Sequence, residues 1–250
     1  MLARCQHVCA VALALFLLVG LVACTVEEEA CPTGFDFAPA AGEPGSTAVA
    51  MSDSRIVGWA TEVVSLAIGE SVDEEWMDPQ QALGPAEGTP GNVLALGRGG
   101  HVVLLFDPPI TDGDGADLAV FENSLNDTFL ELAFVEVSSD GETFARFPSY
   151  YKGTEPVGTY AGHDPTWISG LAGKYRGGFG TPLDLADLDC APEVVGGSVD
   201  TASISFVRIV DIIGDGQTPD GTGRPIYDPY PTVGSAGFDL DAVAALHEAG

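Results

Sequence analysis

Short runs of alternating apolar and polar residues, separated by Gly, Pro and Asp, fill the chain from Gly58 onward. Such runs are typical of β-strands, because successive side chains point to opposite faces of a sheet. They predict eight strands, at 62–68, 92–96, 101–106, 117–122, 132–138, 143–147, 204–213 and 238–246. The Ala-rich end, 241–249, could be helical instead. The pattern predicts an all-β fold, a jelly-roll-like β-sandwich.

The segment from about 148 to 200 has a different pattern. It is rich in Gly, Pro, Tyr and Trp and has few strand signals. A long irregular segment inside a compact domain is usually functional or disordered. The aromatic content favours an ordered binding loop, so we expect a long aromatic and Gly-rich insertion loop in the sandwich.

The first 24 residues have the pattern of an export signal. Arg4 precedes an apolar run at 11–21, and the tetrapeptide 21–24, Leu-Val-Ala-Cys, follows. The run is shorter than the roughly 20 residues that span a bilayer. The tetrapeptide resembles the lipobox of bacterial lipoproteins, which implies a signal peptide at 1–23 and a lipid on Cys24. An ordinary secretory signal is the alternative.

Lipidation would make the anchor the only contact with the membrane. Thr25 differs from the aspartate that retains some lipoproteins at the inner membrane, so we expect an outer-membrane or cell-surface location. Residues 24–57 carry three glutamates at 27–29 and continue with little periodicity, which predicts a flexible tether before a binding domain at 58–250. Cys31 and Cys190 are expected to form a disulfide in an oxidising compartment, with two free thiols as the alternative.

The charge of the chain restricts its partners. Asp and Glu number 37 and Lys and Arg number 9, and the formal net charge is −28. All of the acidic residues follow Cys24. A surface this negative repels nucleic acids and anionic lipids, so we expect no nucleic-acid partner and expect divalent cations as counter-ions.

Several segments resemble a known family. Residues 134–144 look like the hairpin of galactose-binding-like, discoidin-type β-sandwiches, with Asp140-Gly141 at the turn. Residues 81–85, 206–209 and 237–243 fit the same module. More narrowly, 97–123 and 227–232 resemble uncharacterised bacterial cell-surface lipoproteins related to PEP-CTERM-anchored proteins. The resemblance covers most of 58–246 and implies a fold, whereas the ligands of such modules vary widely.

Carboxylates in glycine-rich turns are candidate calcium ligands, because Ca²⁺ takes six to eight oxygens and glycines let the backbone curl. The run 112–117 supplies Asp112, Asp114 and Asp117. A solvated acidic turn is the alternative.

Strand periodicity adds further candidates. Asp211 falls on an apolar strand face and needs a partner, and Asp239 and Asp241 share a face two residues apart. The family resemblance implies that Asp78 could join them in a structural calcium site. A salt bridge is the alternative role for these residues.

Planar aromatic rings stack on sugars and arginine forms bidentate hydrogen bonds, so they are candidates for ligand binding. The candidates are Trp76, Trp167, Tyr175, Arg176, Tyr227 and Tyr230. Packing of these rings in the core of the loop is the alternative.

Together these features predict a cell-envelope lipoprotein with a calcium-stabilised β-sandwich that binds an extracellular ligand, a carbohydrate by preference. We predict no catalytic residue, because the chain has no Gly-x-Ser-x-Gly, zinc-ligand, P-loop or dinucleotide motif. His163 beside Asp164 is the only histidine worth testing. A glycan-active enzyme with paired carboxylates and a structural surface protein without a small ligand are the alternatives.

Overall fold

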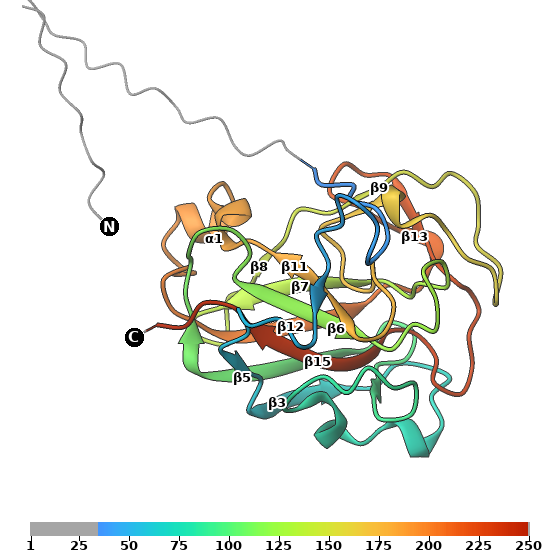
Figure 1. The fold of residues 1–250 in the computed structure, drawn as a ribbon, viewed down its shortest axis with the longest axis horizontal. Coiled ribbons are helices and arrows are strands. Elements are labelled where there is room, and N and C mark those ends of the chain that lie inside the picture. Colours follow the sequence, from blue (N-terminus) through green and yellow to red (C-terminus); the bar gives the residue numbers. More distant parts are fainter. Residues whose placement is uncertain (1–34, 250) are drawn as a thin grey trace, which may run out of the picture. The chain divides into compact units, whose positions relative to one another are not determined.

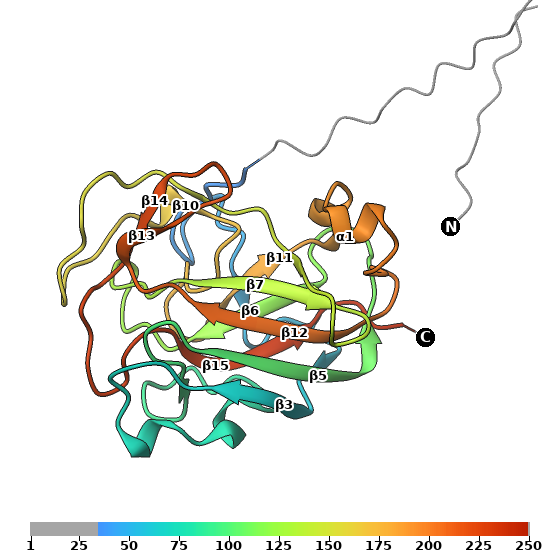
Figure 2. The same cartoon turned by 180° about the vertical axis from the view of Figure 1, so that it is seen from behind.

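Two antiparallel sheets form the fold in the computed structural model, which describes residues 35–249 (Figure 1). Figure 2 shows the second sheet lying across the first. The first has the order β1 (Val49–Ala50), β11 (Phe179–Leu183), β6 (Leu118–Glu122), β15 (Asp239–Ala245) and β2 (Gly58–Trp59), with β4 (Leu94–Ala95) also on β15. The second has the order β3 (Glu62–Ala67), β5 (His101–Ile110), β12 (Ile204–Asp211), β7 (Ala133–Ser138) and β8 (Ala145–Arg146).

The chain alternates between the sheets: β5 lies in the second, β6 in the first and β7 in the second. This crossing confirms the predicted all-β, jelly-roll-like sandwich. Two small two-stranded sheets accompany the two main sheets, β9 (Tyr150–Tyr151) with β10 (Ile168–Ser169) and β13 (Asp215–Pro219) with β14 (Pro225–Tyr227). The short helices are the 3₁₀ helices η1 (Glu74–Trp76), η2 (Pro79–Ala82), η3 (Pro165–Trp167) and η4 (Leu185–Leu188), and α1 (Pro192–Val195).

Strand β6 is buried on both faces. Leu118 and Val120 pack in the main core between the sheets, whereas Ala119 and Phe121 pack in a second cluster on the opposite face. All five residues of β6 are buried. A strand covered on both sides needs apolar residues at most consecutive positions. Its antiparallel neighbour β15 is likewise buried at every position, although it includes Asp239 and Asp241.

Residues 35–57 differ from the expected tether. Ala38, Ala41 and Val49 are buried, and β1 pairs with the edge of β11. The domain therefore begins well before residue 58. The apolar residues of this segment are small and widely spaced, so they give no periodic signal, although they cover part of the sandwich.

The segment 148–200 also differs from the expectation of an irregular loop. It contains β9, β10 and β11, and β11 pairs with β6 inside the first sheet. The sequence pattern did not predict this strand because it contains Gly180 and Pro182, and both residue types are unusual in strands. A Cβ on Gly180 would lie 2.8 Å from the Phe121 ring, so the close packing of β11 against Phe121 requires glycine.

The predicted strands otherwise correspond to observed ones with shifts at their ends, the longest extension being β5 to Ile110. The hairpin at Asp140-Gly141 is confirmed: β7 pairs with β8, and Gly141 has φ of 78°. The helical alternative for 241–249 is wrong, because β15 continues to Ala245. Within residues 35–249, every helix is too short or too polar to cross a membrane.

Candidate functional site

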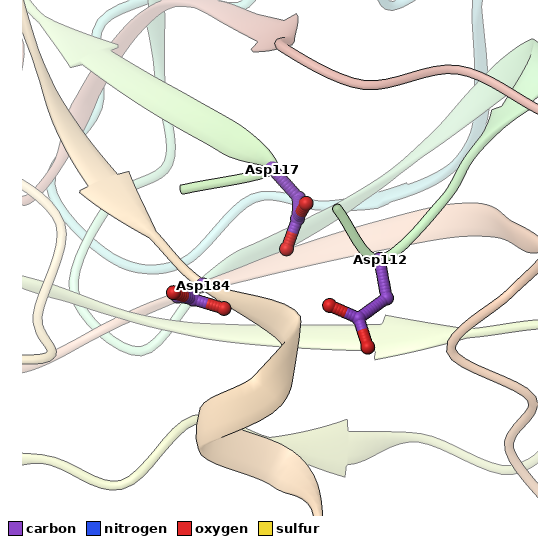
Figure 3. Close-up of side chains that lie close together, drawn as sticks. All are labelled: Asp112, Asp117 and Asp184. Carbon is purple, nitrogen blue, oxygen red and sulfur yellow. The ribbon is translucent and has the colours of Figure 1, made fainter. Parts of the chain in front are cut away.

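Three aspartates converge where the β5–β6 loop meets the end of β11. Asp112 lies in the loop after β5, Asp117 directly precedes β6, and Asp184 directly follows β11. One carboxylate oxygen of each lies within 4.8 Å of the others. Figure 3 shows the three side chains pointing toward one space. Three oxygens at this separation could bind one hard cation.

Asp117 is the fixed member of this triad. It is completely buried. Its Oδ1 accepts hydrogen bonds from the Gly113 amide and from His247 Nδ1, both at 2.8 Å, and its Oδ2 accepts from the Leu185 amide at 2.7 Å. These bonds connect the loop before β6, the start of η4 and the end of the chain after β15. The position of Asp117 is thus set by the fold.

Asp112 and Asp184 are more accessible. The Asp184 side chain caps η4 by accepting from the Ala186 amide at 3.0 Å. Partial burial and then the charge of Asp117 raise the pKa of Asp112. The pKa of Asp184 is raised by partial burial and, to a smaller extent, by Asp117 and Asp189. A cation in this space would relieve the repulsion that raises both values.

The structure unites two of the three predicted ligands in the loop 112–117. Asp112 and Asp117 belong to the triad, whereas Asp114 does not and is exposed. The third member, Asp184, was missed because it follows β11, which the sequence did not predict. The available signal was the Asp-Leu-Ala start of a short helix, which is a capping pattern.

Asp211 and Asp241 hold loops in position by accepting hydrogen bonds from backbone amides. Asp211 accepts from Gly99 at 2.7 Å and from Phe238 at 2.8 Å. Asp241 accepts from Glu87 at 3.0 Å and Gly88 at 2.8 Å. Both oxygens of each carboxylate therefore have a structural role, and cation binding by these two residues stays a prediction.

Asp78 and Asp239 lie in different environments. Asp78 caps η2 by accepting from the Gln80 amide at 3.0 Å. Asp239 begins β15, is 3% exposed, and accepts from Asn123 Nδ2 at 3.3 Å. The pairing of these two aspartates around one ion stays a prediction.

The predicted ligand-binding side chains differ in exposure. Trp167 in η3 is 39% exposed, whereas Tyr175 is 2% exposed and its hydroxyl lies 2.9 Å from Thr47 Oγ1. Arg176 pairs with Asp127 and donates to the Ala41 carbonyl. The remaining three, Trp76, Tyr227 and Tyr230, are half-buried.

A cavity of about 580 Å³ adjoins the triad, and Asp184 lines it together with Thr47, Lys174 and Tyr175. Lys174 is buried, and its Nζ donates to the carbonyl of Ile168 at 2.8 Å and of Asp36 at 3.2 Å. Burial lowers the Lys174 pKa to about 8. The cavity lining therefore combines the ammonium group of a buried lysine, hydroxyl groups and a carboxylate.

His163 is a structural residue in this fold. Its Nδ1 bonds the Tyr151 hydroxyl and its Nε2 bonds the Leu130 carbonyl, both at 2.9 Å. Burial lowers its pKa to about 4. Asp164 caps η3. Both ring nitrogens are thus committed to the core.

Cys190 is disulfide-bonded. Cys24 and Cys31 lie outside the described residues, so the lipid anchor and the pairing of Cys31 with Cys190 stay predictions. Comparisons with known proteins found no matching family model and no matching curated protein.

Proposed function

We propose that this protein is a cell-envelope lipoprotein whose β-sandwich binds Ca²⁺ at the triad and an extracellular carbohydrate in the adjoining cavity. The observation that carries this proposal is the convergence of Asp112, Asp117 and Asp184. The strong excess of acidic residues and the lipobox-like start of the chain support it.

The donor chemistry of the triad favours calcium. All three side chains offer carboxylate oxygens, the ligands of hard cations, and zinc prefers nitrogen and sulfur. The fold fixes Asp117, and the two more accessible aspartates leave room for backbone carbonyls or water to complete six to eight ligands. Neutralising the repulsion between Asp112 and Asp184 would stabilise the folded state.

Asp184 connects the ion to the ligand site, because it belongs to the triad and also lines the cavity. A cation on Asp184 would fix the start of η4 and thereby this wall of the cavity. The volume falls in the range of small-molecule sites, roughly 300–1,000 Å³. The hydroxyls of Thr47 and Tyr175 and the ammonium group of Lys174 suit the hydroxyl groups of a sugar.

Thermal unfolding in Ca²⁺ and in EGTA tests the cation. We expect Ca²⁺ to raise the Tm of the wild type, and the Asp112→Asn/Asp184→Asn double variant to lose most of that increase. Asp114→Asn is the matched control, because it removes a charge from the same loop outside the triad. Equal Ca²⁺ responses in the wild type and the double variant would contradict the proposal.

The same proteins on a glycan array test the ligand. Wild type and Asp114→Asn should bind in Ca²⁺ and lose binding in EGTA, and the double variant should bind weakly in both. Glycan binding that is indifferent to Ca²⁺ would separate the cavity from the triad, and an array without any signal would remove carbohydrate as the ligand.

A further inference from the structure

Three carboxylates are buried toward the other end of β6. Glu122 ends β6, Glu131 lies in the segment before β7, and Asp239 begins β15, which is the antiparallel neighbour of β6. Their exposed fractions are 2%, 4% and 3%. Burial of a carboxylate is unfavourable unless hydrogen bonds or an opposite charge compensate it.

Two oxygens of this cluster have no compensation of that kind. Glu131 Oε1 and Asp239 Oδ1 are completely buried and lack any hydrogen-bond partner within residues 35–249. The other oxygen of Asp239 accepts from Asn123, and Glu122 Oε2 accepts from the Ser124 amide at 2.8 Å. A buried polar atom without a partner costs about 1–3 kcal/mol and is rare in native proteins.

The three carboxylates are close enough to repel one another. Besides burial, the charges of Asp239 and Glu122 raise the pKa of Glu131, and the charge of Asp239 raises that of Glu122. None of the three forms an ion pair with a lysine, arginine or histidine of residues 35–249. Among the described residues, no ion pair therefore balances this repulsion.

Glu136 shows how this fold neutralises a buried carboxylate elsewhere. It is 5% exposed, which is comparable with the cluster. Arg146 Nη2 lies 2.7 Å from its Oε1, and Arg208 pairs with its Oε2. Asp211 and Asp241 are also buried without an ion pair, but backbone amides donate to both oxygens of each. Glu131 and Asp239 differ from all of these in having an oxygen with neither kind of partner.

We propose that Glu122, Glu131 and Asp239 form a second Ca²⁺ site, separate from the Asp112–Asp117–Asp184 triad. The unpartnered oxygens of Glu131 and Asp239 would bind the ion directly. The side chains of Thr232 and Ser235, which lower the pKa values of Glu131 and Asp239, would add hydroxyl oxygens as ligands. The site offers oxygen ligands only, which suits Ca²⁺ and not a metal that prefers nitrogen or sulfur.

The two sites lie at opposite ends of one strand. Five residue steps of roughly 3.3 Å separate Asp117 from Glu122, or about 16 Å. A single ion cannot serve both clusters. The second ion would join the end of β6, the start of β15 and the segment before β7, so its role would be to lock these elements together.

Equilibrium dialysis of the full chain in detergent against Ca²⁺, followed by metal analysis, tests this proposal. We expect two ions bound to the wild type and one to Glu131→Gln/Asp239→Asn, in which amides replace the two carboxylates at nearly equal volume. The double variant of the triad, Asp112→Asn/Asp184→Asn, serves as the matched comparison and should also retain one ion.

The outcomes separate the two sites. Equal stoichiometry in the wild type and Glu131→Gln/Asp239→Asn would overturn the second site. Equal stoichiometry in the wild type and the triad variant would instead overturn the triad.

Wild-type crystals give a test that needs no folded variant. With Tb³⁺ as the probe, an anomalous peak should lie within about 2.6 Å of Glu131 Oε1 and Asp239 Oδ1. A map with no peak between these two atoms would overturn the proposal.

Discussion

Asp117→Asn tests the hydrogen bonds that build the triad, independently of any ion. The carboxylate accepts three hydrogen bonds: from the Gly113 amide, the Leu185 amide and His247 Nδ1. Asparagine has nearly the same shape but keeps one acceptor oxygen and turns the other into an NH₂ donor. Whichever way the amide group is oriented, at least one backbone N–H then faces a donor.

The size of the effect follows from burial. Asp117 is 0% exposed, so water cannot replace the lost acceptor. An unsatisfied buried donor costs about 1–3 kcal/mol, and the lost bonds were charge-assisted. We expect Asp117→Asn to lower the free energy of unfolding by about 2–3 kcal/mol, and the Tm by roughly 4–12 °C for a domain of this size.

Urea unfolding in EGTA at about pH 7.5 is the assay, because it removes any contribution from bound Ca²⁺. Asp112→Asn is the control: it removes a charge from the same triad, but its pKa is raised by burial and by Asp117. Without an ion, Asp112→Asn should therefore cause no loss of stability. Unfolding of Asp117→Asn at the wild-type urea concentration, or an equal loss of stability in both variants, would refute a structural role for these three hydrogen bonds.

Two further predictions concern pH and the disulfide. The pKa values of Asp211 and Asp239 are raised to about 6 and about 7, chiefly by burial. The folded state therefore keeps protons that the unfolded state releases near pH 4, so the stability of the metal-free protein should fall as the pH rises from about 4 to about 7, and Ca²⁺ should reduce this fall; flat urea midpoints over this range in EGTA would contradict the shifts. Non-reducing peptide mapping should find Cys190 linked to Cys31, and a peptide that joins Cys190 to any other cysteine would disprove that pairing.

The sequence predicted the sandwich well because the long strands carry their own signal. In β12, for example, Val207 and Ile209 face the main core, and Arg208 lies between them on the other face beside Glu136. Period-two alternation of this kind depends only on local burial. The hairpin at Asp140-Gly141 has a similarly local cause, because Asp140 Oδ1 accepts from the Glu142 and Thr143 amides.

The segments that were missed depend on distant partners. Val49 and Gly180 form a strand pair only because β1 meets β11, 131 positions later in the chain. Neither segment has a strand-like composition of its own. Packing against β6 and Phe121 supplies the stability that intrinsic propensity does not, and a single sequence carries no record of that packing.

The residues of the two acidic sites also differ in whether the local sequence predicts them. Asp112 and Asp117 were predicted because they share one glycine-rich loop. Asp184 and Glu131 join their clusters from separate segments, and 37 acidic residues gave no means of choosing them. The register of β6 with β15, in which Glu122 pairs with Leu240 beside Asp239, brings Glu122 and Asp239 to neighbouring positions.

The β6–β15 pair thus has acidic residues at both ends, and the two groups differ in their exposure and in their hydrogen-bond partners. At one end backbone amides and His247 hold Asp117, so the charge there is already partly balanced and the other two aspartates are accessible. At the other end Glu131 and Asp239 are sealed in the core with unpartnered oxygens. A bound cation would consequently be exchangeable at the first end and enclosed at the second. Because about 16 Å of buried strand separates them and they share no residue, their contributions to stability should add.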